Sequence, residues 1–278
     1  MLSYDEETSR RVEDVYTTAG VIEQRQAVLE QLALQPGERV LDVGVGPGFL
    51  AADMAAAVGQ DGLVCGIDPS DSMLALAGRR AVVPLAAPLQ LQRGDACHVP
   101  YPDGSFDVVV STQVLEYVDD IPAALAEIRR VLRPGGRVLL LDTDWDSIVW
   151  SSSDEARTRA VLHAWEQHLA DPHLPRRLAG CLERAGFVVT SVRALTLLNV
   201  GFEPRTYSTG LLDLIVAFVA GRDGLGEQDA QAWAVDVRSR GRNYFFSLNR
   251  YIICATTAAE MKSSTARSSG SVSPTQGS

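Results

Sequence analysis

Residues 39–50 constrain the fold of this chain more than any other segment. Their sequence, RVLDVGVGPGFL, is an aliphatic run followed by a glycine turn, which consists of Gly44, Gly46 and Gly48. Such a run is typical of a buried strand, and the glycines predict a sharp turn into a helix that begins near Phe49. The unpaired N–H groups of that helix then face the turn, so the segment predicts a nucleotide-type ligand site in an α/β protein.

The spacing of the glycines and two nearby acids narrow the choice of ligand. A dinucleotide fingerprint would place its third glycine at residue 49, which is Phe49, whereas this chain has it one position earlier. Asp42 precedes the turn, and a carboxylate there repels a pyrophosphate but attracts an amino group. A second expected strand, residues 63–67, ends at Asp68, which is placed to bind the hydroxyls of a ribose. These signals favour an adenosine that carries an amino acid rather than a diphosphate.

Five short motifs follow one another in a fixed order along the chain. They are Asp42-Val-Gly-Val-Gly-Pro-Gly48, Ile67-Asp68-Pro-Ser70, Gly94-Asp95-Ala96, Ser105-Phe-Asp-Val-Val-Val110 and Leu132-Arg-Pro-Gly-Gly-Arg137. Together they resemble the motifs of the class I S-adenosylmethionine (SAM)-dependent methyltransferases, and most closely those of the ubiquinone/menaquinone C-methyltransferase-like group, also called methyltransferase type 11. The resemblance covers residues 39–142 and continues more weakly to about residue 255. It implies an α/β, Rossmann-like fold with a seven-stranded, mostly parallel sheet, an antiparallel last strand, helices on both faces and a small helical cap.

The resemblance implies S-adenosyl-L-methionine as the cofactor and assigns roles to motif residues. The glycine turn seats the methionine part, and Asp42 bonds either the loop or the amino group. Asp68, followed by Pro69, binds the ribose. Asp95 accepts a hydrogen bond from the adenine amino group, and the backbone N–H of Ala96 meets the ring.

Further cofactor contacts are expected outside these motifs. Tyr16 and Arg25 match a tyrosine and an arginine that line the methionine end in relatives, although core packing and a solvated helix face are equally open interpretations. Met73 lies either under the adenine or in ordinary core. The loop after the fourth strand contacts the methionine moiety and the substrate in relatives, which makes candidates of Ser111, Thr112 and Gln113.

The fifth expected strand ends in a cluster of acids that we interpret as the substrate side of the site. Asp142 or Asp144 would act as a base for the methylated group if burial raises its pKa. Trp145 would stack on a flat substrate or face the sulfonium, whose positive charge an aromatic ring attracts. The alternative is that the acids cap the next helix or lie in water.

Histidine spacing and overall charge argue against several other classes of protein. His163 and His168 are five residues apart, which does not match the i, i+4 pair of a helical metal site, so no metal is expected. We interpret these two and His173 as surface or half-buried side chains. The net charge of −10 argues against nucleic acid as a partner.

The cysteines and the hydropathy favour a cytoplasmic protein. The four cysteines lack C-x-x-C spacing and are interpreted as reduced thiols. The acidic and polar start predicts no signal peptide. The longest apolar run, residues 211–220, is too short to cross a membrane.

The chain is expected to form one domain with additions. Residues 1–36 predict a helical leader that covers the cofactor, with its first helix at residues 3–15. Residues 37–261 predict the methyltransferase domain, which includes a helix at 151–170 and a strand at 187–195. A helical insertion at about residues 197–242 is either a lid over a hydrophobic substrate or plain core packing. Residues 262–278 are rich in Ser, Thr and Gly and are expected to be disordered.

The function expected is in-line transfer of the SAM methyl group to a small organic acceptor, in secondary or quinone-type metabolism, with O-, N- and C-methylation all open. Relatives often carry Cys or Ser where this chain has Val45, and quinone-type relatives often carry His within the stretch that is residues 113–118 here, which makes quinone C-methylation less favoured. A nicotinamide-dependent reductase is one alternative, against which Phe49 argues. A SAM-fold protein that transfers no methyl, either a cyclase or a regulatory module, is the other.

Overall fold

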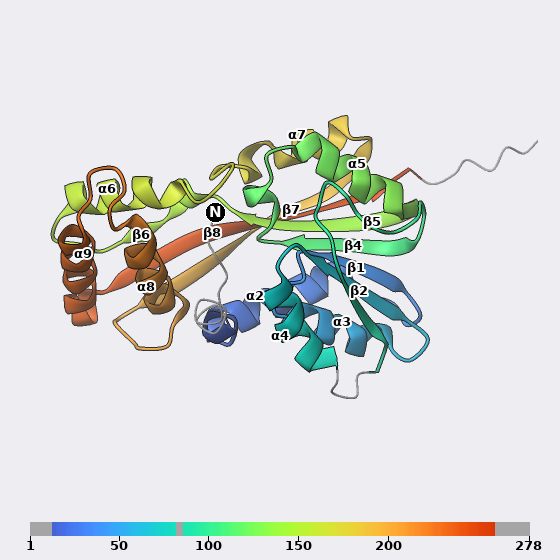
Figure 1. The fold of residues 1–278 in the computed structure, drawn as a ribbon, viewed down its shortest axis with the longest axis horizontal. Coiled ribbons are helices and arrows are strands. Elements are labelled where there is room, and N and C mark those ends of the chain that lie inside the picture. Colours follow the sequence, from blue (N-terminus) through green and yellow to red (C-terminus); the bar gives the residue numbers. More distant parts are fainter. Residues whose placement is uncertain (1–12, 82–85, 259–278) are drawn as a thin grey trace, which may run out of the picture.

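The computed structural model describes residues 13–81 and 86–258, which form one mixed sheet with helices on both faces and a helical cap at one end (Figure 1). The expected helix at residues 3–15 lies largely outside the described residues, of which 13–16 are helical. The expected disordered tail, 262–278, lies entirely outside them. The strands are β1 Arg39–Val43, β2 Leu63–Asp68, β3 Leu89–Arg93, β4 Phe106–Thr112, β5 Leu132–Thr143, β6 Val149–Trp150, β7 Phe187–Val200 and β8 Phe245–Thr257.

The helices belong to two groups, one against the sheet and one in the cap. The sheet helices are α2 Ala19–Leu32, α3 Phe49–Val58, α4 Asp71–Ala81, α5 Ile121–Val131 and α7 Pro175–Arg184. The cap helices are α6 Glu155–Glu166, α8 Tyr207–Val219 and α9 Glu227–Ser239. Single 3-10 turns are η1 Leu115–Tyr117, η2 Trp145–Ser147 and η3 Gly241–Asn243.

The sheet confirms the predicted fold class. The strand order is β3-β2-β1-β4-β5-β8, in which neighbours from β3 to β5 run parallel and β8 runs antiparallel to β5. The other edge of β8 pairs along its whole length with β7. The described residues form eight strands rather than seven, because the two residues of β6 also pair with β8.

Strand side chains alternate between two apolar layers, which is why β1 and β4 are continuous apolar runs in the sequence. One layer lies against α5 and α7 and includes Leu41, Val43, Val109 and Leu140. The opposite layer lies against α2, α3 and α4 and includes Val40, Val108, Val110, Leu139 and Leu141. Figure 1 shows these helix groups above and below the sheet.

The strands β7 and β8 form a long antiparallel hairpin that extends from the sheet into the cap (Figure 1). The sequence predicted a strand at 187–195 and an insertion from 197, but pairing continues to Val200 opposite Phe245. Likewise, the helix expected at 151–170 begins only at Glu155, because the preceding Val149–Trp150 pairs with β8. The cap has an aromatic core of its own, in which Trp150, Trp165, Trp233 and Phe246 are buried.

Register brings the carboxyl ends of four strands to one edge of the sheet. Val43, the last residue of β1, pairs with Ile67 of β2 and Ser111 of β4. Asp68 pairs with Arg93 at the end of β3. Because ligands of open α/β sheets bind at this edge, the glycine turn and the polar residues that follow β2, β3 and β4 are placed to form one site.

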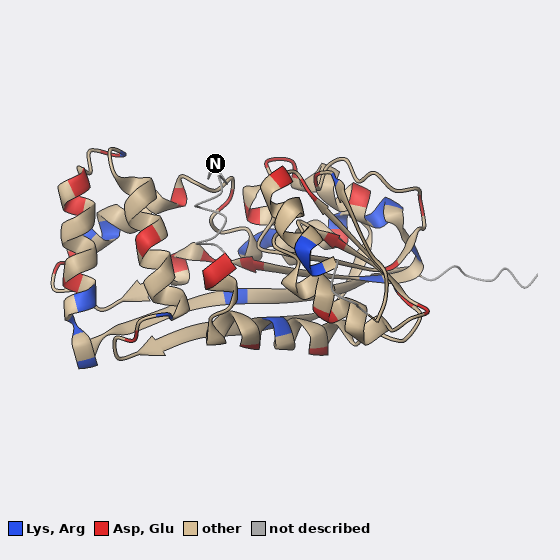
Figure 2. Cartoon of the chain, turned by 60° about the horizontal axis from the view of Figure 1, so that its bottom comes forward, with Lys and Arg blue, Asp and Glu red and all other residues tan. Residues whose placement is uncertain are grey.

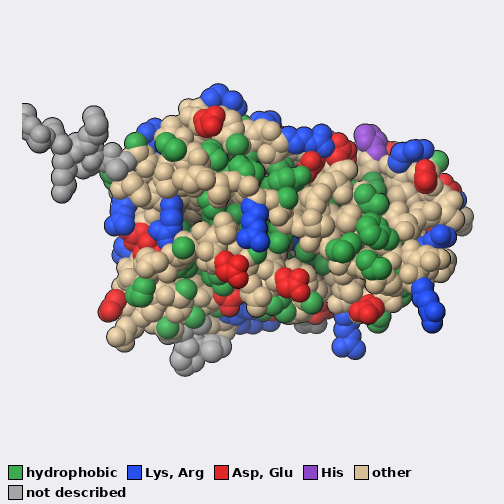
Figure 3. Space-filling view, turned by 180° about the vertical axis from the view of Figure 1, so that it is seen from behind, with side chains coloured by type: hydrophobic (Ala, Val, Ile, Leu, Met, Phe, Trp, Pro, Cys, Tyr) green, Lys and Arg blue, Asp and Glu red, His purple; other side chains and the backbone are tan. Residues whose placement is uncertain are grey.

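Charges of both signs are interspersed over the described surface. Figure 2 shows acidic and basic residues alternating along helices and loops, and Figure 3 shows the same mixture with apolar side chains on the face opposite to Figure 1. No helix within the described ranges has the length and apolarity needed to cross a membrane.

Alanine substitutions at Gly48 and Gly37 should separate the cost of steric overlap from the cost of backbone strain. The φ of Gly48 is +82°, and an added Cβ would lie 2.8 Å from the Cβ and 2.9 Å from the Cα of Ala77. Gly37 has a φ of +85° with nothing within 4 Å of an added Cβ. We expect Gly48→Ala to lower the free energy of unfolding in urea by about 1–3 kcal/mol more than Gly37→Ala, because only the first adds overpacking. Equal losses would contradict the tight packing of α3 on α4.

Candidate functional site

An edge cavity of about 350 Å³ lies where the strand ends meet. Its wall combines the glycine turn, the β2–α4 connection, the residues after β3 and the loop after β4, together with Tyr16 from the leader. Ten of the thirteen predicted cofactor residues line it: Tyr16, Gly44, Gly46, Asp68, Pro69, Met73, Asp95, Ala96, Thr112 and Gln113. The other three, Arg25, Asp42 and Gly48, lie outside this wall.

The glycine turn is held against β2 and against the loop after β4. The backbone N–H of Gly44 donates to the carbonyl of Ile67 at 2.8 Å, as does that of Val45 at 2.9 Å. Gly44 has a φ of +76°, and an added Cβ would lie 2.2 Å from Cγ2 of Val114. A side chain at this position would therefore displace either the turn or the loop that closes the cavity.

Asp68 joins the glycine turn to the start of α4. Its Oδ2 accepts from the N–H of Gly46 and its Oδ1 from the N–H of Ser70, both at 2.9 Å. Burial raises the pKa of this carboxyl, while the two N–H groups lower it. Each carboxylate oxygen has a further lone pair, so Asp68 still offers acceptors to hydroxyl groups in the cavity that it lines.

Asp42 is a buried acid behind the turn whose charge is not compensated. It is 2% exposed, and its Oδ1 has no hydrogen-bond partner among the described residues. Burial, and then the charge of Asp68, raises the pKa of Asp42 to about 7. Two carboxylates at one turn fit a ligand with a positively charged amino group, as SAM has, and fit a pyrophosphate poorly.

The far end of the edge cavity has the form expected for an adenine site. Met73 and Ala96 are buried and line the wall, so Met73 packs in the core and faces the cavity at once. Asp95 is exposed, and its Oδ1 accepts from the N–H of Cys97 at 2.8 Å. A buried apolar wall beside an exposed acceptor suits a flat ring with an amino group at its edge.

Arg25 positions the leader rather than lining the edge cavity. Its Nη1 donates to the carbonyl of Tyr16 at 2.7 Å, and its Nε to Oδ2 of Asp53 at 3.2 Å. The Tyr16 ring stacks on Phe49 with centroids 6.1 Å apart. The arginine therefore fixes the wall residue Tyr16 over the glycine turn. Gly48, which also lies outside the wall, packs against Ala77.

A second cavity of about 150 Å³, which we call the aromatic chamber, adjoins the edge cavity. Four residues line both cavities and form their common wall: Tyr16, Thr112, Gln113 and Tyr117. The rest of the chamber comes mainly from the leader, from the end of α6 and from α8. Its aromatic and aliphatic wall includes Trp145, Trp165, Tyr207, Leu211 and Leu214.

Gln113, in the common wall, has an unusual backbone and an unsatisfied side chain. Its φ is +58°, which costs free energy for a residue with a Cβ and is common at ligand sites. Its Oε1 accepts from Oγ1 of Thr143 at 2.8 Å, whereas its Nε2 is buried without a partner among the described residues. The free amide donor is therefore available to a ligand at the junction of the cavities.

Glu116 is the acid of the chamber that sequence reasoning missed. Its Oε2 accepts from the N–H of Thr143 at 3.1 Å and from Nε1 of Trp145 at 3.2 Å. Burial raises the pKa of Glu116 to about 7. The sequence offered one signal, a glutamate inside the loop after the fourth strand, three residues beyond the contact candidate Gln113.

Arg250 ties the chamber together from β8. Its Nε donates to Oγ1 of Thr143 at 3.3 Å, its Nη2 to the hydroxyl of Tyr207 at 2.8 Å, and its Nη1 to Oε1 of Gln24. The side chain is buried, and its positive charge lowers the pKa of nearby Glu116, against the larger effect of burial. One arginine thus joins the sheet, the leader helix α2 and the cap helix α8.

Of the three catalytic candidates, only Trp145 lines the chamber. Asp142 is 1% exposed, and its Oδ1 accepts from the N–H groups of Val114 at 3.1 Å and Glu116 at 3.3 Å. Oδ2 of Asp144 accepts from Nε of Arg176 at 2.9 Å. Neither aspartate lies in the wall of either cavity, because each holds neighbouring chain in place instead.

His168 departs from the expectation of a surface or half-buried side chain. It is 4% exposed and lines the aromatic chamber. The difference arises because the chain after α6 turns inward, so that the imidazole packs on Trp165 with ring centroids 3.8 Å apart and meets Phe218 at 5.6 Å. Residue spacing could not show this, because the contact with Phe218 of α8 is between distant segments.

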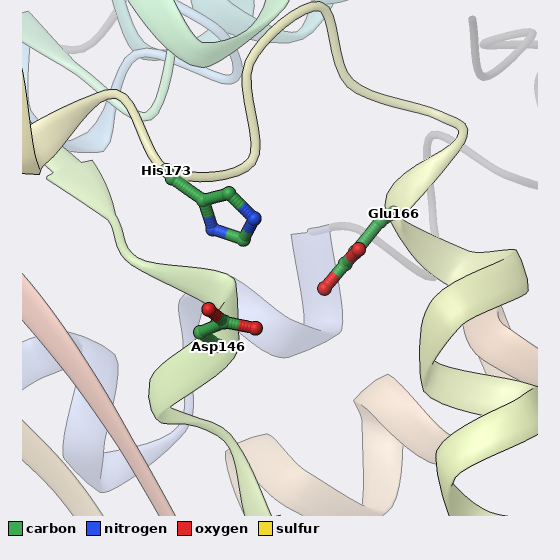
Figure 4. A group of neighbouring side chains, drawn as sticks. All are labelled: Asp146, Glu166 and His173. Atoms are coloured by element: carbon green, nitrogen blue, oxygen red, sulfur yellow. The ribbon is translucent and has the colours of Figure 1, made fainter.

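Three side chains with ligand-type atoms meet at the surface near the chamber (Figure 4). One ligand atom each of Asp146, Glu166 and His173 lies within 4.8 Å of the others. Asp146 is exposed, and its Oδ2 accepts from Nη2 of Arg176 at 2.7 Å. Because this ion pair already satisfies the acid, we assign no metal role to the group.

The chain is similar to known methyltransferases. A family model described as a methyltransferase domain matches residues 41–140. The demethylmenaquinone methyltransferase of Symbiobacterium thermophilum is 33% identical over 198 residues, which covers 63% of this chain and 78% of that protein. A protein of Streptomyces fradiae, described as an uncharacterized 37.1 kDa protein in transposon TN4556, is 37% identical over 186 residues, 66% of this chain and 53% of its own length. This chain therefore spans about half the length of the latter relative.

The fold of this chain also matches that of a solved protein. The crystal structure of the YcgJ protein from Bacillus subtilis superposes with a TM-score of 0.61 at 17% identity, covering 86% of this chain and 100% of that one. At this identity the likeness concerns the fold alone. The alignment that covers 78% of the Symbiobacterium thermophilum protein, the matching methyltransferase-domain model and the site at the carboxyl edge of the sheet together identify the chain as a member of the class I SAM-dependent methyltransferase family.

Proposed function

We propose that this chain binds SAM in the edge cavity and transfers its methyl group to a small organic acceptor in the aromatic chamber. The observation that carries the proposal is the common wall of the two cavities, formed by Tyr16, Thr112, Gln113 and Tyr117. Adjacent sites for donor and acceptor are what an in-line displacement requires, since its rate depends on alignment of the reacting groups.

The proposed cofactor roles follow from the contacts of the edge cavity. Asp68 accepts from the ribose hydroxyls, Asp95 and Ala96 meet the adenine, and the ammonium group compensates Asp42. Bound SAM supplies an electrophilic methyl group. The chain's own residues hold the donor, orient the acceptor and exclude water.

The chamber favours an acceptor with one aromatic ring. Its volume of about 150 Å³ resembles that of an engineered apolar cavity, about 150 Å³, that holds benzene. Trp145, Tyr117 and Tyr207 supply faces on which such a ring can pack. The relative from Symbiobacterium thermophilum is named for a quinone acceptor, which is also a flat ring, so quinone-type metabolism remains within the proposal.

The leader and the cap are proposed to enclose the acceptor. Val15 and Tyr16 come from the leader, while Leu211 and Leu214 come from α8, and all four line the chamber. The proposed location is cytoplasmic, which fits the four cysteines, all of them free thiols.

The test combines binding and transfer. Calorimetric titration should show binding of SAM and S-adenosylhomocysteine but not NADH, and label from methyl-labelled SAM should pass to members of a panel of phenols, amines and quinones. Binding of NADH alone would support the reductase alternative. Adenosyl-ligand binding without transfer to any acceptor would support the alternative of a cyclase or regulatory module.

Replacement of Asp68 should weaken the cofactor without abolishing the fold. We expect Asp68→Ala to lower the SAM binding free energy by about 1.5–3 kcal/mol, because charge-assisted hydrogen bonds to the ribose are lost. Asp71→Ala is the matched control, since Asp71 is an exposed acid three residues away whose pair with Arg93 is also exposed. Unchanged affinity in folded Asp68→Ala would remove Asp68 from the ribose site.

The pKa of Asp42 predicts a pH dependence of binding. Below about pH 7 the carboxyl is protonated and must lose its proton to pair with an ammonium group, so affinity for S-adenosylhomocysteine should rise as pH rises through about 7. The stability of the free protein changes with pH in the opposite direction. Its free energy of unfolding falls as pH rises from 3.8 to about 7, because the stability that protonated Asp42 contributes is lost over this range.

Calorimetry from pH 5.5 to 8.5 checks this dependence, at pH values chosen to bracket a pKa of about 7. 5′-Methylthioadenosine, which lacks the amino-acid part, is the matched ligand, and its affinity should change less. Asp42→Asn should flatten the profile for S-adenosylhomocysteine. Parallel profiles for the two ligands in the wild-type protein would show that Asp42 does not respond to the ammonium group.

A further inference from the structure

His168 has one ring nitrogen in use and one without a partner. Nδ1 is hydrogen-bonded to the backbone carbonyl of Trp165. Nε2 is buried and has no partner among the described residues, although the side chain lines the aromatic chamber and is only 4% exposed. A buried polar atom left without a partner destabilises the free protein, so its position in a ligand cavity calls for an explanation.

The protonation state of the ring follows from its contacts. A carbonyl oxygen only accepts, so Nδ1 carries the hydrogen. Burial lowers the pKa of His168 to about 4, which keeps the imidazole neutral at physiological pH. The neutral Nδ1–H tautomer leaves a lone pair on Nε2, so His168 presents an acceptor and not a donor.

Among the described residues, the surroundings of the imidazole leave few other partners for Nε2. Four aromatic rings surround it, those of Trp145, Trp165, Tyr117 and Phe218, at centroid distances of 5.5, 3.8, 5.8 and 5.6 Å. The charged chamber groups bond elsewhere, Glu116 to Trp145, Arg250 to Tyr207 and Arg25 to Asp53. Nε1 of Trp165 is likewise buried without a partner, so it makes no hydrogen bond to Nε2. A ligand in the chamber is therefore the natural source of a donor for Nε2.

We infer that Nε2 of His168 accepts the proton of an aromatic hydroxyl group as that oxygen is methylated, which makes the acceptor a phenol-type compound and His168 the base. The inference rests on the proposed function and deepens it. The aromatic chamber binds the ring, and His168 packs edge-on against Tyr117 of the common wall, so one side chain separates it from the edge cavity.

The step balances without any further reactant. The bond between the acceptor oxygen and the methyl carbon forms while the bond from that carbon to sulfur breaks, and its electron pair neutralises the sulfonium. The hydroxyl proton moves to Nε2 as the oxygen–methyl bond forms, because the oxygen becomes strongly acidic only as it gives its electron pair to carbon. The resulting imidazolium, whose pKa burial lowers, readily returns the proton to solvent after the products leave.

The first measurement is ligand binding, which does not depend on turnover. With S-adenosylhomocysteine bound, the wild-type protein should bind phenol about tenfold more tightly than toluene, because only phenol donates a hydrogen bond to Nε2. His168→Phe keeps an aromatic ring of similar size and should abolish this preference. His168→Gln offers an amide oxygen and should retain part of it.

The second measurement is transfer of labelled methyl from SAM to phenol. His168→Phe and His168→Gln should both lower kcat by about 100-fold or more, since neither side chain accepts a proton. Affinity for S-adenosylhomocysteine should stay unchanged in both variants, which shows that they are folded and that the cofactor site is intact.

The outcomes separate this inference from the proposed function. If adenosyl ligands do not bind the wild-type protein, the proposed function fails. If they bind normally but the wild-type protein does not prefer phenol to toluene, the phenol acceptor is overturned. If His168→Gln transfers methyl to phenol as fast as the wild-type protein, or the wild-type protein no faster than His168→Phe, the base is overturned.

Discussion

The hydrogen bond from the N–H of Gly46 to Oδ2 of Asp68 joins the two strand ends on which the site depends. It spans the gap between the turn after β1 and the connection after β2. The second carboxylate oxygen of Asp68 binds the N–H of Ser70 and so fixes the entry to α4. Because one acid orders both loops, the edge cavity is largely formed before a ligand arrives, which lowers the entropy lost on binding.

The aromatic chamber depends on a different element, the long hairpin of β7 and β8. Beyond the end of β5 this hairpin continues into the cap and carries Arg250 at the point of departure. The arginine reaches Thr143 of β5, Gln24 of α2 and Tyr207 of α8. A buried cation with hydrogen bonds to the sheet, the leader and the cap therefore links the three, and a shift of the cap would break its bond to Tyr207.

The sequence predicted well wherever local chemistry decides the structure. The aliphatic runs of β1 and β4 and the positive-φ glycines after β1 follow from backbone sterics and burial, so their positions matched the expectation. Ten cofactor candidates met in one cavity because parallel strands end at one edge. The length of β7 was missed because it depends on pairing with β8, which is about 50 residues away in the sequence.

The chamber was hardest to predict because its residues meet only through tertiary packing. Asp142 and Asp144 were expected on the substrate side, but hydrogen bonds to the loop after β4 and to Arg176 engage their carboxylates, and neither lines a cavity. Glu116 and His168 enter the wall from segments that showed no motif. Their burial could not be read from helical spacing, since it depends on how α8 covers the end of α6.

Three of the unsatisfied polar atoms of the described residues lie in or behind the cavity walls. Nε2 of Gln113 belongs to the common wall, Nε2 of His168 to the chamber, and Oδ1 of Asp42 to the turn behind the edge cavity. Such groups destabilise a free protein, whereas the strands beneath them are apolar and well packed. They differ in what they lack: an acid without a cation, an amide without an acceptor, and an imidazole without a donor. A zwitterionic donor beside a hydroxylated acceptor would offer partners to the amide and the imidazole, and its ammonium group would attract the carboxylate of Asp42 through the turn. The free energy that these groups cost the empty fold thus becomes available to binding.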